Sequence, residues 1–158
     1  MNKSMLTGLG FGLTSAVVTT LGLMIGLNAS TGSKLAVIGG ILTIALADAF
    51  SDALGVHVSK ETEKGAIAKE VLAATGFTFL FKFIFALTFV VPVIFFSLST
   101  AIIISIVWGL SILSLLSYFL AKSQGQSRLE SLGEHLVIAI AVLLLSNGIG
   151  SVIAKYFN

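Results

Sequence analysis

Five stretches of this chain are long and apolar enough to cross a lipid bilayer, and they limit the fold more than any other feature. A spanning helix needs about 20 mostly apolar residues. In lipid a helix satisfies its own backbone hydrogen bonds, whereas an isolated strand cannot. We therefore expect an all-α fold, a single transmembrane domain over 1–158 with a short cytoplasmic connection at about 59–71, and five helices at about 7–28, 35–58, 72–96, 98–120 and 131–156.

Composition supports an integral membrane protein. Hydrophobic residues make up 56% of the chain and charged residues 10%, whereas a soluble domain carries roughly a quarter charged residues. The net charge of +2 is small and the charges are scattered, which argues against nucleic-acid binding. The sequence has no cysteine, which excludes disulfides, thiolate metal sites and cysteine nucleophiles.

Basic residues between the apolar stretches predict the orientation. Cytoplasmic loops of membrane proteins are enriched in Lys and Arg. We expect the N-terminus in the cytoplasm and the C-terminus outside, because Lys34 and Lys155 then lie outside and six basic residues lie inside: Lys3, Lys60, Lys64, Lys69, Lys122 and Arg128. The absence of a long targeting segment favours a prokaryotic plasma membrane.

The stretch "LADAFSDALGVH", residues 46–57, places Asp48 and Asp52 inside the second apolar run. Residues four apart share one face of a helix, and an Asp near the centre of a spanning helix costs roughly 2.5–3.5 kcal/mol. The pair should therefore face protein, water or a cation rather than lipid. Two carboxylates this close would hold a proton between them or bind a divalent cation in its place.

Two interpretations of the aspartate pair remain open from the residues alone. Lys82, the one cation well inside another span, could form a structural salt bridge, although a single lysine would neutralise only one aspartate. In the functional interpretation, oxygen ligands suit Mg(II), Ca(II) and Mn(II), and Fe(II) tolerates a similar set. The candidate metal ligands are then Asp48, Asp52 and Glu63, and the candidate ion pathway adds Ser15, Thr19, Ser59 and Asn147.

The two histidines are expected to lie outside this ligand set. His57 is on a different face of its helix from Asp52, since five residues rotate the chain well away from the starting face. His135, beside Glu134 at the start of the fifth span, is expected to have an interfacial role without metal.

Small residues recur along one face of the first span. Six of them follow spacings of three and four: Gly8, Gly12, Ser15, Thr19, Gly22 and Gly26. Such faces let helix backbones approach closely in lipid. We expect a close helix–helix seam here, either with another helix of this chain or at a homodimer axis.

No sequence motif indicates an enzyme. The chain lacks a nucleophile elbow, a phosphate-binding loop and a His-rich metal-hydrolase motif. The internal carboxylates are the remaining chemistry, so we expect a transporter with no permanent cofactor. Two alternatives stay open: a non-transporting membrane scaffold or subunit, and a proton or monovalent-cation conduit.

Two segments resemble the vacuolar iron transporter family. "GFGLTSAVVTTLGLMIGL", residues 10–27, is similar to that family's first-helix signature, G-L-T-D-G-L-V-T-T-L-G-L-x-x-G, and "IALADAFSDALGVHVSKETE", residues 44–63, is similar to its second helix. The resemblance implies a homodimer in the lipid bilayer that exports cytosolic Fe(II), and often Mn(II), in exchange for protons. It also implies an ion path at the dimer interface, with the metal as transported substrate.

The chain departs from the family pattern within these two segments. Ser15 stands where the family usually has Asp, Asp52 where it usually has Met, and Val56 where it usually has Glu. A carboxylate has in effect moved between facing helices, which preserves the charge of the site and hardens its ligands. That change would favour Mn(II) relative to Fe(II). The family's longer, Glu-rich cytoplasmic insertion is missing.

Overall fold

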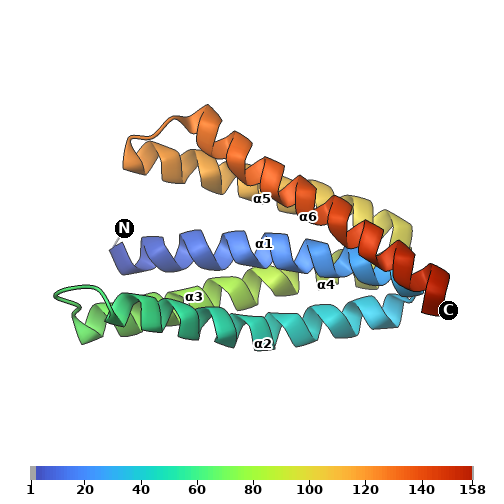
Figure 1. Cartoon of the computed structure of the whole chain (residues 1–158), viewed down its shortest axis with the longest axis horizontal. Coiled ribbons are helices and arrows are strands. Elements are labelled where there is room, and N and C mark those ends of the chain that lie inside the picture. The colour runs from blue at the N-terminus through green and yellow to red at the C-terminus, as the bar shows by residue number, and fades with distance from the viewer. Residues whose placement is uncertain (1–2, 158) are drawn as a thin grey trace.

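The computed structural model describes residues 3–157, and this part of the chain contains helices and no strand. Figure 1 shows the helices running back and forth along one axis. Their bounds are α1 Lys3–Thr31, α2 Lys34–Glu61, α3 Ala68–Thr88, α4 Val90–Phe95, α5 Leu98–Gln124 and α6 Arg128–Phe157. With α3 and α4 counted as one interrupted span, five helices are long and apolar enough to cross a membrane, which confirms the expected fold class at that level.

The connection between the second and third spans is shorter than expected. α2 continues to Glu61 and α3 begins at Ala68, so only residues 62–67 join them. The helices therefore extend into the connection predicted at about 59–71 from both sides. Lys and Glu are good helix formers, so the helices continue past the point where the apolar pattern stops.

The third span is interrupted near its single proline. α3 ends at Thr88, and α4 begins after Phe89. Because Pro92 has no backbone N–H, the carbonyl of Thr88 loses its usual helical partner. The Thr88 hydroxyl donates to the Phe85 carbonyl at 2.6 Å and accepts a hydrogen bond from Trp108 Nε1 at 3.1 Å. The bond from Trp108 connects the break to α5.

α1 is the central helix, and it packs against α2, α3, α5 and α6. Figure 1 shows α2 and α3 on one side of α1 and the α5–α6 hairpin on the other. The inward-facing side chains of α1 belong to the main hydrophobic core. The fully buried members of this core include Val17, Leu21 and Met24 of α1, together with Ile41 of α2 and Phe89.

The outer surface of the bundle is also apolar. Large hydrophobic side chains are exposed on the peripheral helices, among them Leu46, Phe50, Ile84, Leu115 and Leu144. Soluble monomers rarely expose contiguous apolar patches of more than a few hundred Å². This surface suits a bilayer as its solvent.

The first half of the small-residue face of α1 packs against α3. A Cβ added at Gly8 would lie 2.4 Å from Phe77 Cβ, and one added at Gly12 would lie 2.7 Å from the Thr78 carbonyl oxygen. Only glycine fits at this separation. The Gly12 position is also 3.2 Å from the backbone nitrogen of Lys82, so the close approach brings Lys82 directly against α1.

The second half of the same face packs against α6. A Cβ on Gly22 would lie 2.9 Å from Val142 Cγ1, and one on Gly26 would lie 3.6 Å from the Ser146 carbonyl oxygen. On α6, a Cβ at Gly150 would meet the Gly26 carbonyl oxygen at 2.4 Å. The close seam predicted from the sequence is confirmed, and it lies within the chain, because α3 and α6 cover these glycines.

We predict that Gly12→Ala destabilises the protein by about 1–3 kcal/mol, the usual effect of overpacking, because the new methyl group would meet the backbone of α3. Gly39→Ala is the matched control, since nothing lies within 4 Å of a Cβ at that position. Thermal unfolding in detergent micelles should show a lower midpoint for Gly12→Ala alone. Equal midpoints for the two variants would contradict the close α1–α3 seam.

Candidate functional site

Lys82 of α3 lies between the two aspartates of α2. Its Nζ forms ion pairs with Oδ2 of Asp48 and with Oδ2 of Asp52. It also donates a hydrogen bond to Ser15 Oγ of α1 at 2.7 Å. Nζ contacts both carboxylates, but its single positive charge offsets only one of their two negative charges, in agreement with the expectation from the sequence. We call these four residues the Lys82 cluster.

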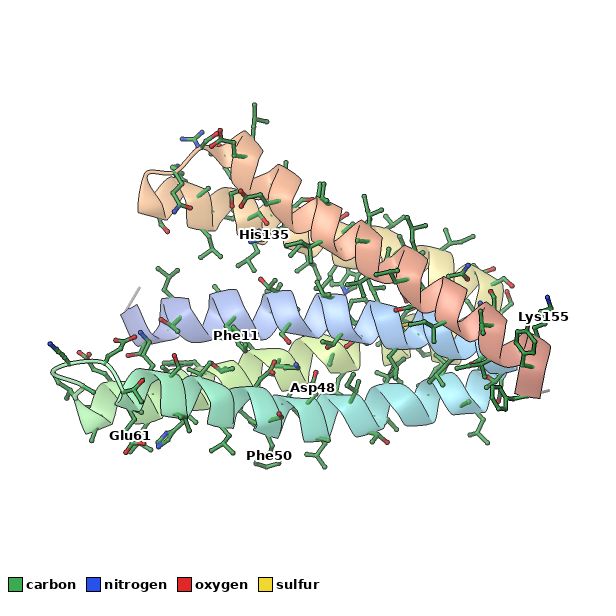
Figure 2. All side chains as sticks on the ribbon, viewed as in Figure 1. Phe11, Asp48, Phe50, Glu61, His135 and Lys155 are labelled. Carbon is green, nitrogen blue, oxygen red and sulfur yellow. The ribbon has the colours of Figure 1, made fainter. Side chains whose placement is uncertain are left out.

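Helix geometry explains how one lysine reaches three partners. Asp48 and Asp52 are one helical turn apart and share a face, and an ammonium group has three N–H donors. Figure 2 shows Asp48 on the side of α2 that faces the bundle and Phe50 on the opposite side. Small residues let α2 come close to its neighbours here, namely the buried Ala45, Ala49 and Ala53.

The Lys82 cluster is largely removed from solvent. The Lys82 side chain is 1% exposed, that of Asp52 17% and that of Asp48 28%. An unpaired charge at such a site would be strongly destabilising. Two carboxylates and one ammonium leave one net negative charge, which attracts a further cation more strongly in a low-dielectric interior than in water.

Asp48 is the less satisfied of the two carboxylates. Asp52 Oδ2 accepts a hydrogen bond from Lys82. The ion pair of Asp48 Oδ2 lacks hydrogen-bond geometry, and that buried oxygen has no hydrogen-bond partner in the part of the chain that the structure describes. Asp48 also borders an open groove of about 650 Å³ along α1 and α2, together with Thr43 and Ser51. The cluster therefore opens towards this groove.

Of two residues predicted for the ion pathway, Thr19 contacts Ser15 of the Lys82 cluster, whereas Asn147 is exposed on α6. The Thr19 hydroxyl donates to the Ser15 carbonyl at 2.7 Å, a bond that threonine often makes within a helix. Ser146, the neighbour of Asn147, is the polar residue that faces α1, since its Oγ lies 3.1 Å from the Cβ position of Gly22.

Glu63 and Ser59 lie towards the end of the molecule where α2 and α3 are joined. Ser59 is exposed on α2. Glu63 follows the end of α2, and its Oε1 lies 2.6 Å from Lys60 Nζ. Ser59 is seven residues beyond Asp52, which is about 10 Å along a helix. Neither residue reaches the Lys82 cluster, so Glu63 is not brought together with the two aspartates as a ligand.

Each histidine hydrogen-bonds to a hydroxyl group on a neighbouring helix. His57 Nδ1 lies 3.1 Å from Thr75 Oγ1, and His135 Nδ1 lies 2.7 Å from Ser117 Oγ. His57 Nε2 also lies 3.9 Å from Glu61 Oε2. Within residues 3–157, no three His, Cys, Asp or Glu side chains gather into a metal-binding group.

A second row of small residues was missed by sequence reasoning. It runs along the exposed side of α2 at intervals of four residues and comprises Gly39, Thr43, Ala47, Ser51, Gly55 and Ser59. Nothing lies within 4 Å of a Cβ at Gly39 or Gly55. The four-residue spacing of this row is visible in the sequence. The buried alanines Ala45, Ala49 and Ala53 have the same spacing, so only the structure shows which of the two rows is exposed.

No protein-family model and no curated protein matches this chain. The resemblance to vacuolar iron transporters therefore rests on residues 10–27 and 44–63. In the structure these residues form most of α1 and the second half of α2, with two residues beyond its end. They include Ser15, Asp48 and Asp52 of the Lys82 cluster.

Removing the ammonium should destabilise the fold. We predict that Lys82→Met lowers the free energy of unfolding by about 3–5 kcal/mol, as when one partner of a buried ion pair is removed. Adding Asp52→Asn to Lys82→Met should recover much of this loss, because it removes one of the two carboxylates left unpaired. Chemical unfolding of both single variants and the double variant measures the coupling. Strictly additive effects would show that the pair does not interact.

Proposed function

We propose that this protein transports a cation across a membrane and that the cation binds at the Lys82 cluster. The observation that carries this proposal is an ammonium group, 1% exposed, held between two carboxylates of which one borders an open groove. In this scheme Lys82 is an internal counter-ion, and the transported cation takes its place between Asp48 and Asp52.

Charge balance favours a divalent ion that exchanges for a proton. The resting cluster carries one net negative charge. If a divalent ion binds and Lys82 gives up one proton, the cluster becomes neutral, which is the least costly state for a buried site. If Lys82 kept its proton, the cluster would become positive. Ion binding and proton release are thus coupled, and a pH gradient can drive the flux.

The donor atoms limit the divalent substrate to ions that accept oxygen ligands. The cluster offers carboxylate oxygens and the Ser15 hydroxyl, and oxygen donors suit Mg(II), Ca(II) and Mn(II), with Fe(II) tolerating a similar set. Among these ions, the resemblance of residues 10–27 and 44–63 to iron transporters supports Mn(II) or Fe(II) as the transported ion, in exchange for protons. Two aspartates on one helix cannot fill an octahedral shell, so water or a second copy of the chain must supply the remaining ligands.

The homodimer expected from the sequence stays a prediction. The glycines of α1 pack within the chain, so a second copy would have to associate elsewhere. The exposed small-residue row of α2 is the surface that would bring a second copy closest to Asp48. Likewise, the cytoplasmic N-terminus and the external C-terminus stay predictions that rest on the distribution of basic residues, and a prokaryotic plasma membrane stays a prediction.

A monovalent cation is the second candidate substrate. If such an ion replaces the proton of Lys82, the cluster keeps the same single negative charge that it has at rest. The charge of the observed cluster therefore supports this exchange as well. Direct flux measurements separate the two candidates.

Flux into proteoliposomes with an imposed pH gradient tests the proposal. The unsubstituted protein should take up Mn(II) or Fe(II). Asp52→Asn should lower this uptake roughly tenfold or more, since a loss of only 1.4 kcal/mol in ion binding gives that factor. Asn has nearly the same size as Asp, so the variant should still fold, which size-exclusion chromatography and circular dichroism can verify.

Glu134→Gln is the matched control for this experiment, because Glu134 is an exposed carboxylate of α6. Its uptake should equal that of the unsubstituted protein. Uptake of Na⁺ or K⁺ without Mn(II) or Fe(II) would favour the monovalent candidate. An absence of flux for every ion, together with failed assembly of Asp52→Asn, would instead indicate a membrane scaffold.

A further inference from the structure

We propose that His57 and Glu61 form a second metal site, which binds a divalent transition-metal ion where α2 ends and the chain turns towards α3. The site is separate from the Lys82 cluster. His57 lies five residues beyond Asp52, about 7.5 Å along the helix, and on a different face. The two residues are four apart on α2, so their side chains share one face.

The hydrogen bonds around His57 determine which ring nitrogen is free. The Thr75 hydroxyl donates its single proton to the Val71 carbonyl at 2.9 Å. Thr75 Oγ1 must therefore accept the 3.1 Å hydrogen bond from His57 Nδ1. In the neutral ring, Nδ1 then carries the proton and Nε2 presents its lone pair. Metal-bound histidines are commonly oriented in this way by a bond to the other nitrogen.

The free nitrogen faces a carboxylate. His57 Nε2 lies 3.9 Å from Glu61 Oε2, and both atoms are acceptors when the ring is neutral. A cation bound between these two atoms would satisfy both. Metal bonds of about 2.0–2.2 Å to nitrogen and oxygen can span this gap, and the Glu61 side chain is 70% exposed, so it can adjust to the ion.

The surroundings leave room for a partly hydrated ion. A cavity of about 380 Å³ adjoins the pair and is lined by His57, Glu61, Ala66, Ala68, Val71 and Leu72. The nearby ammonium of Lys60 contacts Glu63 at 2.6 Å, so it is engaged with a different carboxylate. With two protein ligands, water in the cavity would complete the coordination shell.

An imidazole ligand would give this site a preference that the Lys82 cluster lacks. Oxygen donors alone accept Mg²⁺ and Ca²⁺, whereas imidazole suits transition metals. If the proposed transport function holds, the His57–Glu61 site would select transition metals before they enter the bundle. The role in loading rests on that function, but binding of the metal does not.

Isothermal titration of Co(II) into the full chain in lipid nanodiscs tests the inference. The titrations use the Asp52→Asn background, which weakens the Lys82 cluster as a competing site. We expect saturable binding in this background and its loss in Asp52→Asn/His57→Gln. Adding Thr75→Val instead should weaken binding roughly tenfold, the effect typical of losing a group that orients a ligand.

His135→Gln is the matched control. Ser117 Oγ donates to the Leu113 carbonyl at 2.7 Å, so it accepts from His135 Nδ1, as Thr75 does from His57. Among the described residues, however, His135 has no carboxylate within ion-pair distance. Binding should therefore persist in His135→Gln. Equal loss in the two histidine variants, or no saturable binding at all, would overturn the proposal.

Two outcomes separate this inference from the proposed function. Co(II) binding that depends on His57, without metal flux in the unsubstituted protein, would leave the site standing and reject transport. Metal flux that depends on Asp52, without Co(II) binding at His57, would support transport and reject the His57–Glu61 site. If His57→Gln fails to fold, Co(II)-induced paramagnetic shifts of the His57 ring protons report binding directly, and unshifted ring protons would overturn the proposal.

Discussion

The buried ammonium of Lys82 is the group on which the proposed site depends. It lies between two carboxylates that would otherwise repel each other in an apolar bundle, and it joins α1, α2 and α3 at one point. A buried ion pair is weak support for stability alone, because similarly shaped apolar residues often stabilise as well or better. The net negative charge of the cluster and the groove beside Asp48 are the features that support the proposed exchange of one cation for another.

The position of Lys82 follows from the small residues of α1. Gly8 and Gly12 let the backbone of α3 approach so closely that a methyl group would not fit. This approach places Lys82 beside Ser15, while the alanines of α2 bring the two aspartates to the same point from the other side. In lipid, helices gain little from hydrophobic association and depend on such close packing and on polar contacts. The charged contacts of Lys82 therefore depend on the close packing of α1 against α3 and of α2 against its neighbours.

Helix number and type were predictable from the sequence, because a run of about 20 apolar residues has few alternatives in a bilayer. The shared face of Asp48 and Asp52 followed from helical period, and Lys82 was identified as a partner. Its contact with both carboxylates was not predicted, since the distance between two helices is not encoded in the period of either. The same limit explains why Asn147 was predicted for the ion pathway although Ser146 is the residue that faces α1. It also explains why Glu63 was grouped with Asp48 and Asp52, which lie far from it along α2. Helix ends were misplaced where charged residues with good helix propensity continue the helix beyond the apolar run.

Proton release on metal binding tests the exchange most directly. Mn(II) would be added to the His57→Gln variant in weakly buffered nanodiscs, so that the Lys82 cluster is the site observed, and a pH indicator would record the protons set free. We predict about one proton released for each Mn(II) bound, because metal ligands and their neighbours lose protons when a metal enters. Binding of Mn(II) without proton release would contradict the exchange of the Lys82 proton for a metal ion.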